Sequence, residues 1–159
     1  MRITLAAIGR LRAGPERELF DRFLDRADQA GGRLGLAFRL REYPENPAGD
    51  AATRKHREAA ALIADLPAKS AVVALDEHGK SLDSRAFAGR IANWRDSGTA
   101  ELVFAIGGPD GLGPALLARA DLRLAFGAMT WPHQLVRLML AEQLYRAVTI
   151  LSGHPYHRD

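Results

Sequence analysis

The sequence contains no cysteine. The protein can therefore form no disulfide bond and no cysteine metal site, and it has no thiolate nucleophile. No stretch approaches the roughly 18 consecutive apolar residues of a membrane-spanning helix. The run from Met1 to Gly9 is too short for a secretory signal followed by a cleavage site. These absences predict a soluble protein of the reducing cytoplasm, with no membrane contact.

Several motifs of common enzymes are also missing. The nucleophile elbow GxSxG does not occur, which argues against an α/β hydrolase. Neither the phosphate-binding pattern GxxxxGKS/T nor GxGxxG in its dinucleotide-binding context is present. His154 and His157 are close in sequence, but no third ligand accompanies them, so we predict no metal site.

The excess of basic residues is small. The chain carries 22 Lys+Arg and 19 Asp+Glu, a formal net charge of +3. The surplus lies within residues 1–60, because acidic and basic side chains are equal in number over the rest of the chain. A solvated surface explains such an excess on its own, so any nucleic-acid contact requires a local basic patch rather than a strong overall field.

Short β-rich runs alternate with longer amphipathic segments in a chain of 159 residues, the length of one ordinary domain. The predicted strands are Arg2 to Ile8, Leu36 to Tyr43, Ala71 to Asp76, Glu101 to Ile106 and Leu122 to Phe126. The predicted helices are Pro15 to Gln29, Asp50 to Leu66, Ser84 to Asp96, Pro114 to Ala120 and Pro132 to Leu151. Nearly continuous apolar strands are typical of parallel sheets covered by helices. We therefore predict one α/β domain, residues 1–159, with a mostly parallel sheet flanked by helices.

Two glycine-bearing segments follow predicted strands and precede predicted helices. They are Ile106 to Pro114 and Phe126 to His133. In open α/β sheets, ligands bind beyond the carboxyl ends of strands, and glycine lets the backbone approach a ligand closely. Asp76 and Glu77, which end the third predicted strand, form a candidate acid pair at the same edge. Taken singly, each segment is equally well explained as a turn or as packing at a helix start, and His133 as a structural histidine.

The last predicted helix is apolar on many sides, which implies packing against more than one surface. A homodimer interface and a buried core helix both explain this pattern. Thr130 is the predicted N-cap, Glu142 and Arg146 form an i,i+4 pair, and Gly153 is the predicted stop.

The tail from Gly153 to Asp159 concentrates reactive side chains. His154 and His157 are proton carriers, Tyr156 offers a stacking ring, and Arg158 can bind a phosphate or a base. Chain ends are commonly frayed, so composition alone leaves a functional tail and a frayed end open.

Taken together, five segments resemble one family. They are Leu75-Asp76, Ile106 to Gly111, Met129 to Arg137, Leu144 to Ala147 and His154 to Arg158. In this order the chain resembles the bacterial ribosomal large-subunit (23S rRNA) pseudouridine N3-methyltransferases of the SPOUT superfamily. The resemblance is sharp from Leu75 onward and vague between Gly9 and Lys69.

The resemblance implies an α/β fold with a trefoil knot, which is an exception to the rule against chain threading. It also implies a homodimer that binds S-adenosylmethionine, mainly through main-chain groups, and methylates 23S rRNA in the large subunit or the assembled ribosome. The implied cofactor contacts are Leu75, Gly107, Phe126, Gly127, Ala128, Met129, Thr130 and Trp131. Trp131 replaces an expected leucine. The basic residues expected near positions 45–50 are missing, and Arg54, Lys55 and Arg57 are possible substitutes.

The implied chemistry assigns roles to the remaining residues. His154, His157 or an acidic residue would accept the proton that pseudouridine N3 must lose, Arg137 or Arg158 would stabilise developing charge, and Tyr156 would stack on a base. Two alternatives stay open. One is a SPOUT methyltransferase acting on another RNA site, a ribose 2′-hydroxyl or a tRNA base. The other is a non-catalytic ribosome-binding factor, which would not bind the cofactor.

Overall fold

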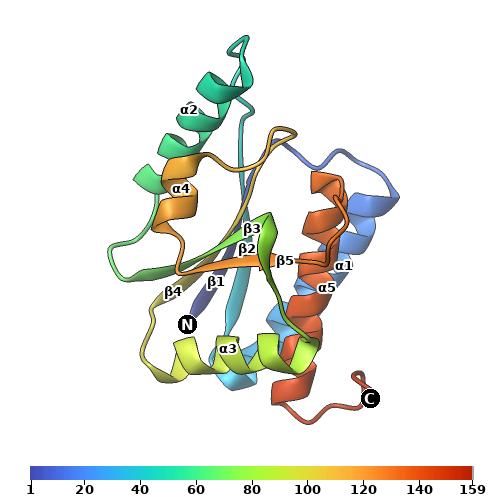
Figure 1. Cartoon of the computed structure of the whole chain (residues 1–159). Coiled ribbons are helices and arrows are strands. Elements are labelled where there is room, and N and C mark those ends of the chain that lie inside the picture. Colours follow the sequence, from blue (N-terminus) through green and yellow to red (C-terminus); the bar gives the residue numbers. More distant parts are fainter. Residues whose placement is uncertain (159) are drawn as a thin grey trace.

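Five parallel strands form one sheet in the order β2-β1-β4-β3-β5 (Figure 1). The computed structural model describes residues 1–158, and Asp159, the last residue of the predicted tail, lies outside the described residues. The strands are β1 (Arg2–Ile8), β2 (Ala37–Tyr43), β3 (Ser70–Ser81), β4 (Glu101–Ile106) and β5 (Leu122–Ala125). The predicted fold class, α/β with a parallel sheet, is confirmed.

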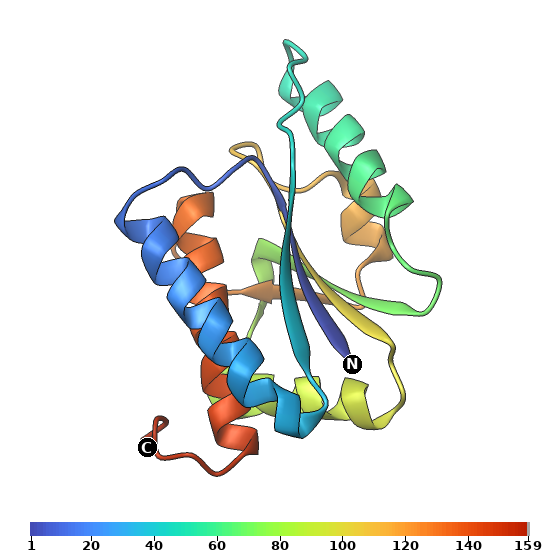
Figure 2. The ribbon, with the colours of Figure 1, turned by 180° about the vertical axis from the view of Figure 1, so that it is seen from behind.

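Helices cover both faces of the sheet. They are α1 (Pro15–Gly31), α2 (Ala51–Ala64), α3 (Ser84–Asp96), α4 (Pro114–Arg119) and α5 (His133–Leu151), with a 3-10 turn, η1 (Gly32–Leu34), after α1. Helices α1, α3 and α5 lie on one face, and α2 and α4 lie on the other (Figures 1 and 2). None of the helices between residues 1 and 158 is both long and apolar enough to cross a membrane.

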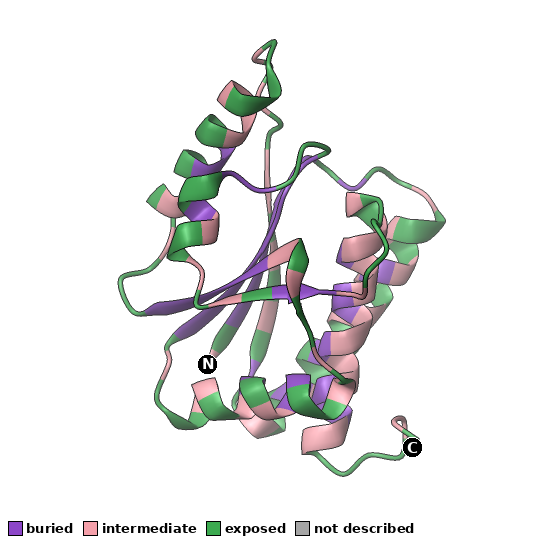
Figure 3. Cartoon of the chain, viewed as in Figure 1, coloured by how far each residue is buried: buried purple, intermediate pink, exposed green. Residues whose placement is uncertain are grey.

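The two cores follow from the alternation of side chains along each strand. Ile3 and Leu5 of β1 face α1, α3 and α5, whereas Ala6 and Ile8 face α2 and α4. Purple buried segments in Figure 3 accordingly run through the central strands and the inner sides of the helices. Burial on both faces explains why β1 and β4 consist almost entirely of apolar residues.

Most predicted boundaries lie within two residues of the observed ones, and β1, α3 and β4 coincide with their predictions. The predicted end of the third strand at Asp76 is wrong, because β3 continues to Ser81. After Leu75 the register shifts, and Lys80 and Ser81 pair again with β5. The sequence does not reveal this extension, because its residues are polar and because a β-bulge interrupts the alternation that marks a strand.

The predicted N-cap of the last helix is also wrong. Helix α5 begins after Pro132, and the Thr130 hydroxyl instead donates a hydrogen bond to Glu77 Oε2 at 2.7 Å. The other two local predictions are confirmed. Glu142 and Arg146 form an ion pair, and the helix stops at Ser152–Gly153, where Gly153 has a φ of +69°.

Candidate active site

A cavity of about 710 Å³ lies where the parallel parts of β3, β4 and β5 end. Its walls come from the middle of β3, where the register shifts, from the loop after β4 and from the loop between β5 and α5. Lys55 of α2 closes one side. The cavity therefore occupies the carboxyl edge of the sheet, where open α/β folds bind ligands.

The loop after β4 is shaped by glycine. A Cβ atom at Gly107 would lie 2.5 Å from the main-chain carbon of Gly111, so a side chain cannot fit without moving the loop. The turn closes through a hydrogen bond from Gly111 N to Gly108 O at 3.0 Å, and Gly111 has a φ of +82°. The backbone of Gly113 lies so close to the Lys55 carbonyl that a side chain at position 113 would displace α2. The loop lines the cavity with Gly107, Gly108 and Gly111 and with Pro109, Asp110 and Leu112.

The second loop, residues 126–132, places apolar side chains at the cavity. Met129 is 71% exposed and Trp131 is 40% exposed, and they are the exposed large hydrophobic side chains of the described chain. The Trp131 indole N–H donates to Phe126 O at 3.2 Å, which links the two ends of the loop. A leucine at this position could not form that bond. Gly127, which has a φ of +104°, makes the turn between Phe126 and Trp131.

The structure brings the predicted cofactor residues to this one cavity, with the exception of Ala128. Ala128 belongs to the same loop but does not line the cavity. Asp76 and Glu77, the candidate acid pair, also line it. Glu77 accepts the Thr130 hydrogen bond described above and so fastens the second loop to β3.

The sequence placed His133 at the end of a candidate ligand-binding segment but assigned it no role beyond that of a structural histidine. It is the first residue of α5, half-buried, and it lines the cavity. Burial lowers the pKa of His133, and the positive charge of Arg137 one turn away lowers it further. Both effects favour the neutral imidazole, and the charge of Glu45 opposes them. Its position directly after a glycine-bearing loop was the available signal.

Arg137 does not face the substrate side as predicted. Its side chain is fully buried, with Nη1 donating to Glu42 Oε1 at 3.2 Å and Nη2 donating to the Ile8 carbonyl. Burial lowers the pKa of Arg137, and the charge of Glu42 opposes that effect. Within one chain, this guanidinium holds α5 against the ends of β1 and β2 instead of entering the cavity.

The tail packs against the far end of α5. The Tyr156 hydroxyl donates to Glu142 Oε1 at 3.1 Å, and the Tyr156 ring lies 4.7 Å from the ring of Tyr145 and 4.9 Å from the Arg146 guanidinium. His157 Nδ1 lies 3.4 Å from Arg146 Nη1. The described part of the tail is therefore anchored rather than frayed.

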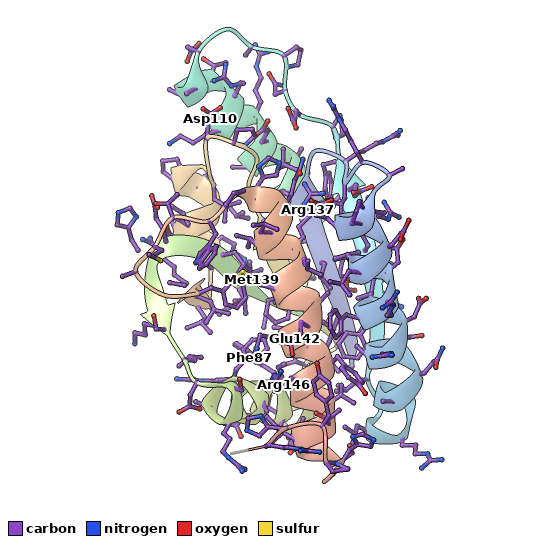
Figure 4. The ribbon with its side chains drawn as sticks, turned by 90° about the vertical axis from the view of Figure 1, so that its right-hand side faces the viewer. Phe87, Asp110, Arg137, Met139, Glu142 and Arg146 are labelled. Atoms are coloured by element: carbon purple, nitrogen blue, oxygen red, sulfur yellow. The ribbon has the colours of Figure 1, made fainter. Side chains whose placement is uncertain are left out.

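The tail and the cavity lie at opposite ends of one helix. Helix α5 has 19 residues, so it is about 28 Å long. In Figure 4, Asp110 and Arg137 are labelled near its upper end, and Glu142 and Arg146 near its lower end. One chain therefore does not bring His154, Tyr156 or His157 to the cavity.

A second hollow, of about 630 Å³, lies on the face formed by α1, α3 and α5. Its apolar lining includes Leu19 and Phe23 of α1 and Leu138 and Met139 of α5. These side chains are only half-buried. Helix α5 thus contacts the core on one side and leaves apolar surface on another, as its sequence predicts.

Comparisons with known proteins agree with this geometry. A family model described as predicted SPOUT methyltransferase matches residues 1–157. The chain is 57% identical to the protein named Ribosomal RNA large subunit methyltransferase H of Bradyrhizobium diazoefficiens, over 99% of both chains. It is 58% identical to the protein of that name in Rhizobium etli and 59% identical to the one in Sinorhizobium medicae, again over 99% of both chains.

A solved structure shares the fold. The crystal structure of a probable methyltransferase from Bordetella pertussis aligns with a TM-score of 0.51 at 16% identity, covering 92% of this chain and 95% of that one. At this identity the likeness concerns the fold alone. It supports the arrangement of the parallel sheet and its helices.

Proposed function

Because this chain belongs to the SPOUT methyltransferase family, we propose that it methylates N3 of a pseudouridine in 23S ribosomal RNA with S-adenosylmethionine as the methyl donor. The names of its relatives support a ribosomal RNA substrate in the large subunit. The observation that carries the proposal is the cavity, since the predicted cofactor residues other than Ala128 meet there although they come from three separate segments.

The cavity suits this cofactor in size and in chemistry. Its volume of about 710 Å³ falls within the usual range of small-molecule sites, about 300–1,000 Å³. Main-chain groups around Gly107 can bind an adenine edge, and the exposed Met129 and Trp131 side chains can cover an apolar ring or a sulfonium cation. The Asp76 carboxylate can accept from a hydroxyl or an ammonium group. The bound cofactor would supply an electrophilic methyl group.

The chain's own task is to align the uracil ring and remove the N3 proton. His154 and His157 are the predicted acceptors, but in one chain they lie about a helix length from the cavity. We therefore propose that the protein acts as a homodimer through the apolar face of α1 and α5. In a two-fold dimer with antiparallel α5 helices, the tail of one copy would lie beside the cavity of the other.

The proposed dimer also explains the exposed surface. Leu19, Phe23, Leu138 and Met139 line a mainly apolar hollow, and such patches commonly mark protein–protein contacts. Tyr156 and Arg158 of the approaching tail would then face the substrate, with Tyr156 stacking on a base. Arg137 would act indirectly, by fixing the first turns of α5 at the cavity.

Two measurements test the proposed function. Calorimetry with S-adenosylmethionine should show one binding site per chain, whereas a ribosome-binding factor without catalysis would show none. Methyl transfer should then be measured on ribosomes, large subunits and free 23S rRNA that lack the modification. Mass mapping of the product should place the methyl group on a pseudouridine base. A methylated ribose or a methylated tRNA would contradict the proposed specificity and leave only the methyltransferase assignment.

A further inference from the structure

Basic side chains at the cavity edge of the sheet differ in what they contact. Arg54 is engaged through two of its three nitrogens, since Nε donates to Asp110 Oδ2 at 2.7 Å and Nη1 donates to the carbonyls of Ala48 and Gly49. Arg17 is paired with Asp21 at 2.8 Å. Arg54 therefore holds the protein's own loops, and Arg17 is paired within α1.

Two arginines on the neighbouring loop are different. Arg10 and Arg12 lie between β1 and α1, both are exposed, and neither has a hydrogen bond or an ion pair with any residue between 1 and 158. The side chain between them, Leu11, is buried and fixes the loop. The Leu11 amide also donates to Glu42 Oε1 at 2.7 Å. The two guanidinium groups are thus presented to solvent from an anchored backbone.

Some acidic groups at this edge are engaged internally, whereas Glu16, Glu18 and Glu45 are exposed near the loop. Glu42 accepts from Leu11 and Arg137, and the buried Glu58 accepts from Asn46 N at 2.9 Å. Asp110 faces two cations, because Arg54 bonds to it and the charge of Lys55 also lowers the pKa of Asp110. Arg10 and Arg12 near this edge, and Lys55 in the cavity lining, are therefore basic side chains without a hydrogen bond or an ion pair among residues 1–158.

The loops that carry these charges stand at the same end of the molecule. In Figure 1 the β1–α1 loop, the loop after β4 and the start of α2 all rise beyond the carboxyl edge of the sheet. A Cβ atom added to Gly108, in the loop after β4, would lie 3.2 Å from the side chain of Ile8 at the end of β1. The arginine loop and the cavity loop are therefore neighbours.

We propose that Arg10 and Arg12, together with Lys55, bind the phosphate backbone of ribosomal RNA on either side of the cavity. The exposed Arg10 and Arg12 and the partly buried Lys55 would hold the strand while the target base enters the cavity, since phosphate contacts position a nucleic acid and leave recognition to the base. This proposal rests on the proposed function, because it takes ribosomal RNA as the ligand. It also revises the sequence-based expectation, in which Arg54 was a candidate RNA contact.

The test compares charge-neutral variants in binding to large ribosomal subunits, without methyl transfer. Arg10→Gln/Arg12→Gln should weaken binding about tenfold at moderate salt, because each phosphate contact contributes counterion release. The slope of log affinity against log salt should fall by about 1.5. Arg10→Lys/Arg12→Lys keeps both charges and should restore most of the affinity, which a purely structural role of the arginines would not predict. Lys55→Gln should reduce the slope by about 0.7.

A matched control carries the same change elsewhere. Arg33 and Arg90 are exposed, and neither has a partner among the described residues. Both lie away from the cavity edge, in η1 and α3. Arg33→Gln/Arg90→Gln should bind subunits like the unaltered protein. Equal losses in both double variants, or no loss at Arg10 and Arg12, would overturn the proposal. Because binding is measured directly, a protein that binds subunits but transfers no methyl group would count against the proposed function only.

Discussion

At the scale of single residues, Asp110 connects two parts of the site. Its carboxylate belongs to the cavity loop after β4, and its partner Arg54 belongs to α2. Arg54 also binds the carbonyls of Ala48 and Gly49, so one guanidinium joins the cavity loop to the connection between β2 and α2. The pair is partly exposed, with side chains 29% and 28% accessible. Its effect should therefore be on loop position rather than on overall stability.

We predict that Asp110→Asn weakens binding of S-adenosylmethionine several-fold while leaving the melting temperature nearly unchanged. The amide cannot replace the charge-assisted bond, so the cavity loop would sample positions that do not match the cofactor. Calorimetry gives the affinity and thermal unfolding gives the stability. Asp96→Asn is the matched control, because the Arg95–Asp96 pair has the same 2.7 Å separation and lies outside the cavity. Equal cofactor affinity in both variants would contradict the prediction.

Single site residues could be predicted from the sequence only where a local pattern marked them. Gly107 and Gly127 could be placed at the site because each directly follows a predicted strand, where parallel sheets bind ligands. Arg137 could not be placed, because its burial is decided by Ile8 and Glu42, which are distant in sequence. No local pattern distinguishes an arginine that will be buried by such partners from one on a surface.

At the scale of elements, three strands share one carboxylate. Glu101 at the start of β4 is nearly fully buried and accepts hydrogen bonds from Thr4 of β1 at 2.6 Å and Arg39 of β2 at 2.8 Å. Arg2 donates to its other oxygen at 3.1 Å. Burial by itself would raise the pKa of Glu101, but the hydrogen bonds from Thr4 and Arg39 outweigh it, and the pKa is lowered.

The lowered pKa predicts how stability changes with pH. A carboxyl group with a depressed pKa in the folded state stabilises the fold above its unfolded value, and this contribution is lost as the pH falls through the folded value. Glu101→Gln should therefore lower the free energy of unfolding by about 2 kcal/mol at neutral pH. The difference should shrink as the pH drops below 4.5, the ordinary value for this group. Urea unfolding across this range is the measurement. A difference independent of pH would show that packing, not charge, explains the loss.

Elements were predictable where their ends carry local chemistry. Asp83 caps α3 by accepting from Ala86 N at 2.7 Å, and α3 has its predicted bounds. The extension of β3 had no such signal. It depends on pairing with β5 after a register shift, and Gly79 packs so closely on Arg123 that a Cβ would lie 2.7 Å from its main chain. That contact exists only once both strands are in place.

At the scale of the whole molecule, alternation of strands and helices was enough to predict a parallel α/β sheet, but not the strand order. Periodicity describes each segment separately, whereas the order β2-β1-β4-β3-β5 depends on how connections cross the sheet. The trefoil knot also depends on how connections cross, so it remains a prediction of the family resemblance. The site followed from combining segments, because Leu75, Gly107 and Trp131 meet only through this order.

The separation of tail and cavity makes the proposed dimer a testable requirement. We predict that two inactive variants restore activity when they are mixed. Gly107→Ala should abolish cofactor binding, because the added Cβ would meet Gly111. His154→Ala/His157→Ala should retain cofactor binding but lose the proton acceptors. In a mixed dimer, the intact cavity of the tail variant would receive the intact tail of the cavity variant.

Random assortment of equal amounts gives half mixed dimers, each with one working site of two, so about one quarter of the unaltered activity should return. Size-exclusion chromatography would verify that both variants remain dimeric, and Gly127→Val, which strains a φ of +104°, offers a second cavity variant. If each cavity used the tail of its own chain, every mixed dimer would lack one component in each site and the mixture would stay inactive. Full activity of the tail variant alone would instead exclude its histidines as proton acceptors and favour His133, the imidazole at the cavity wall.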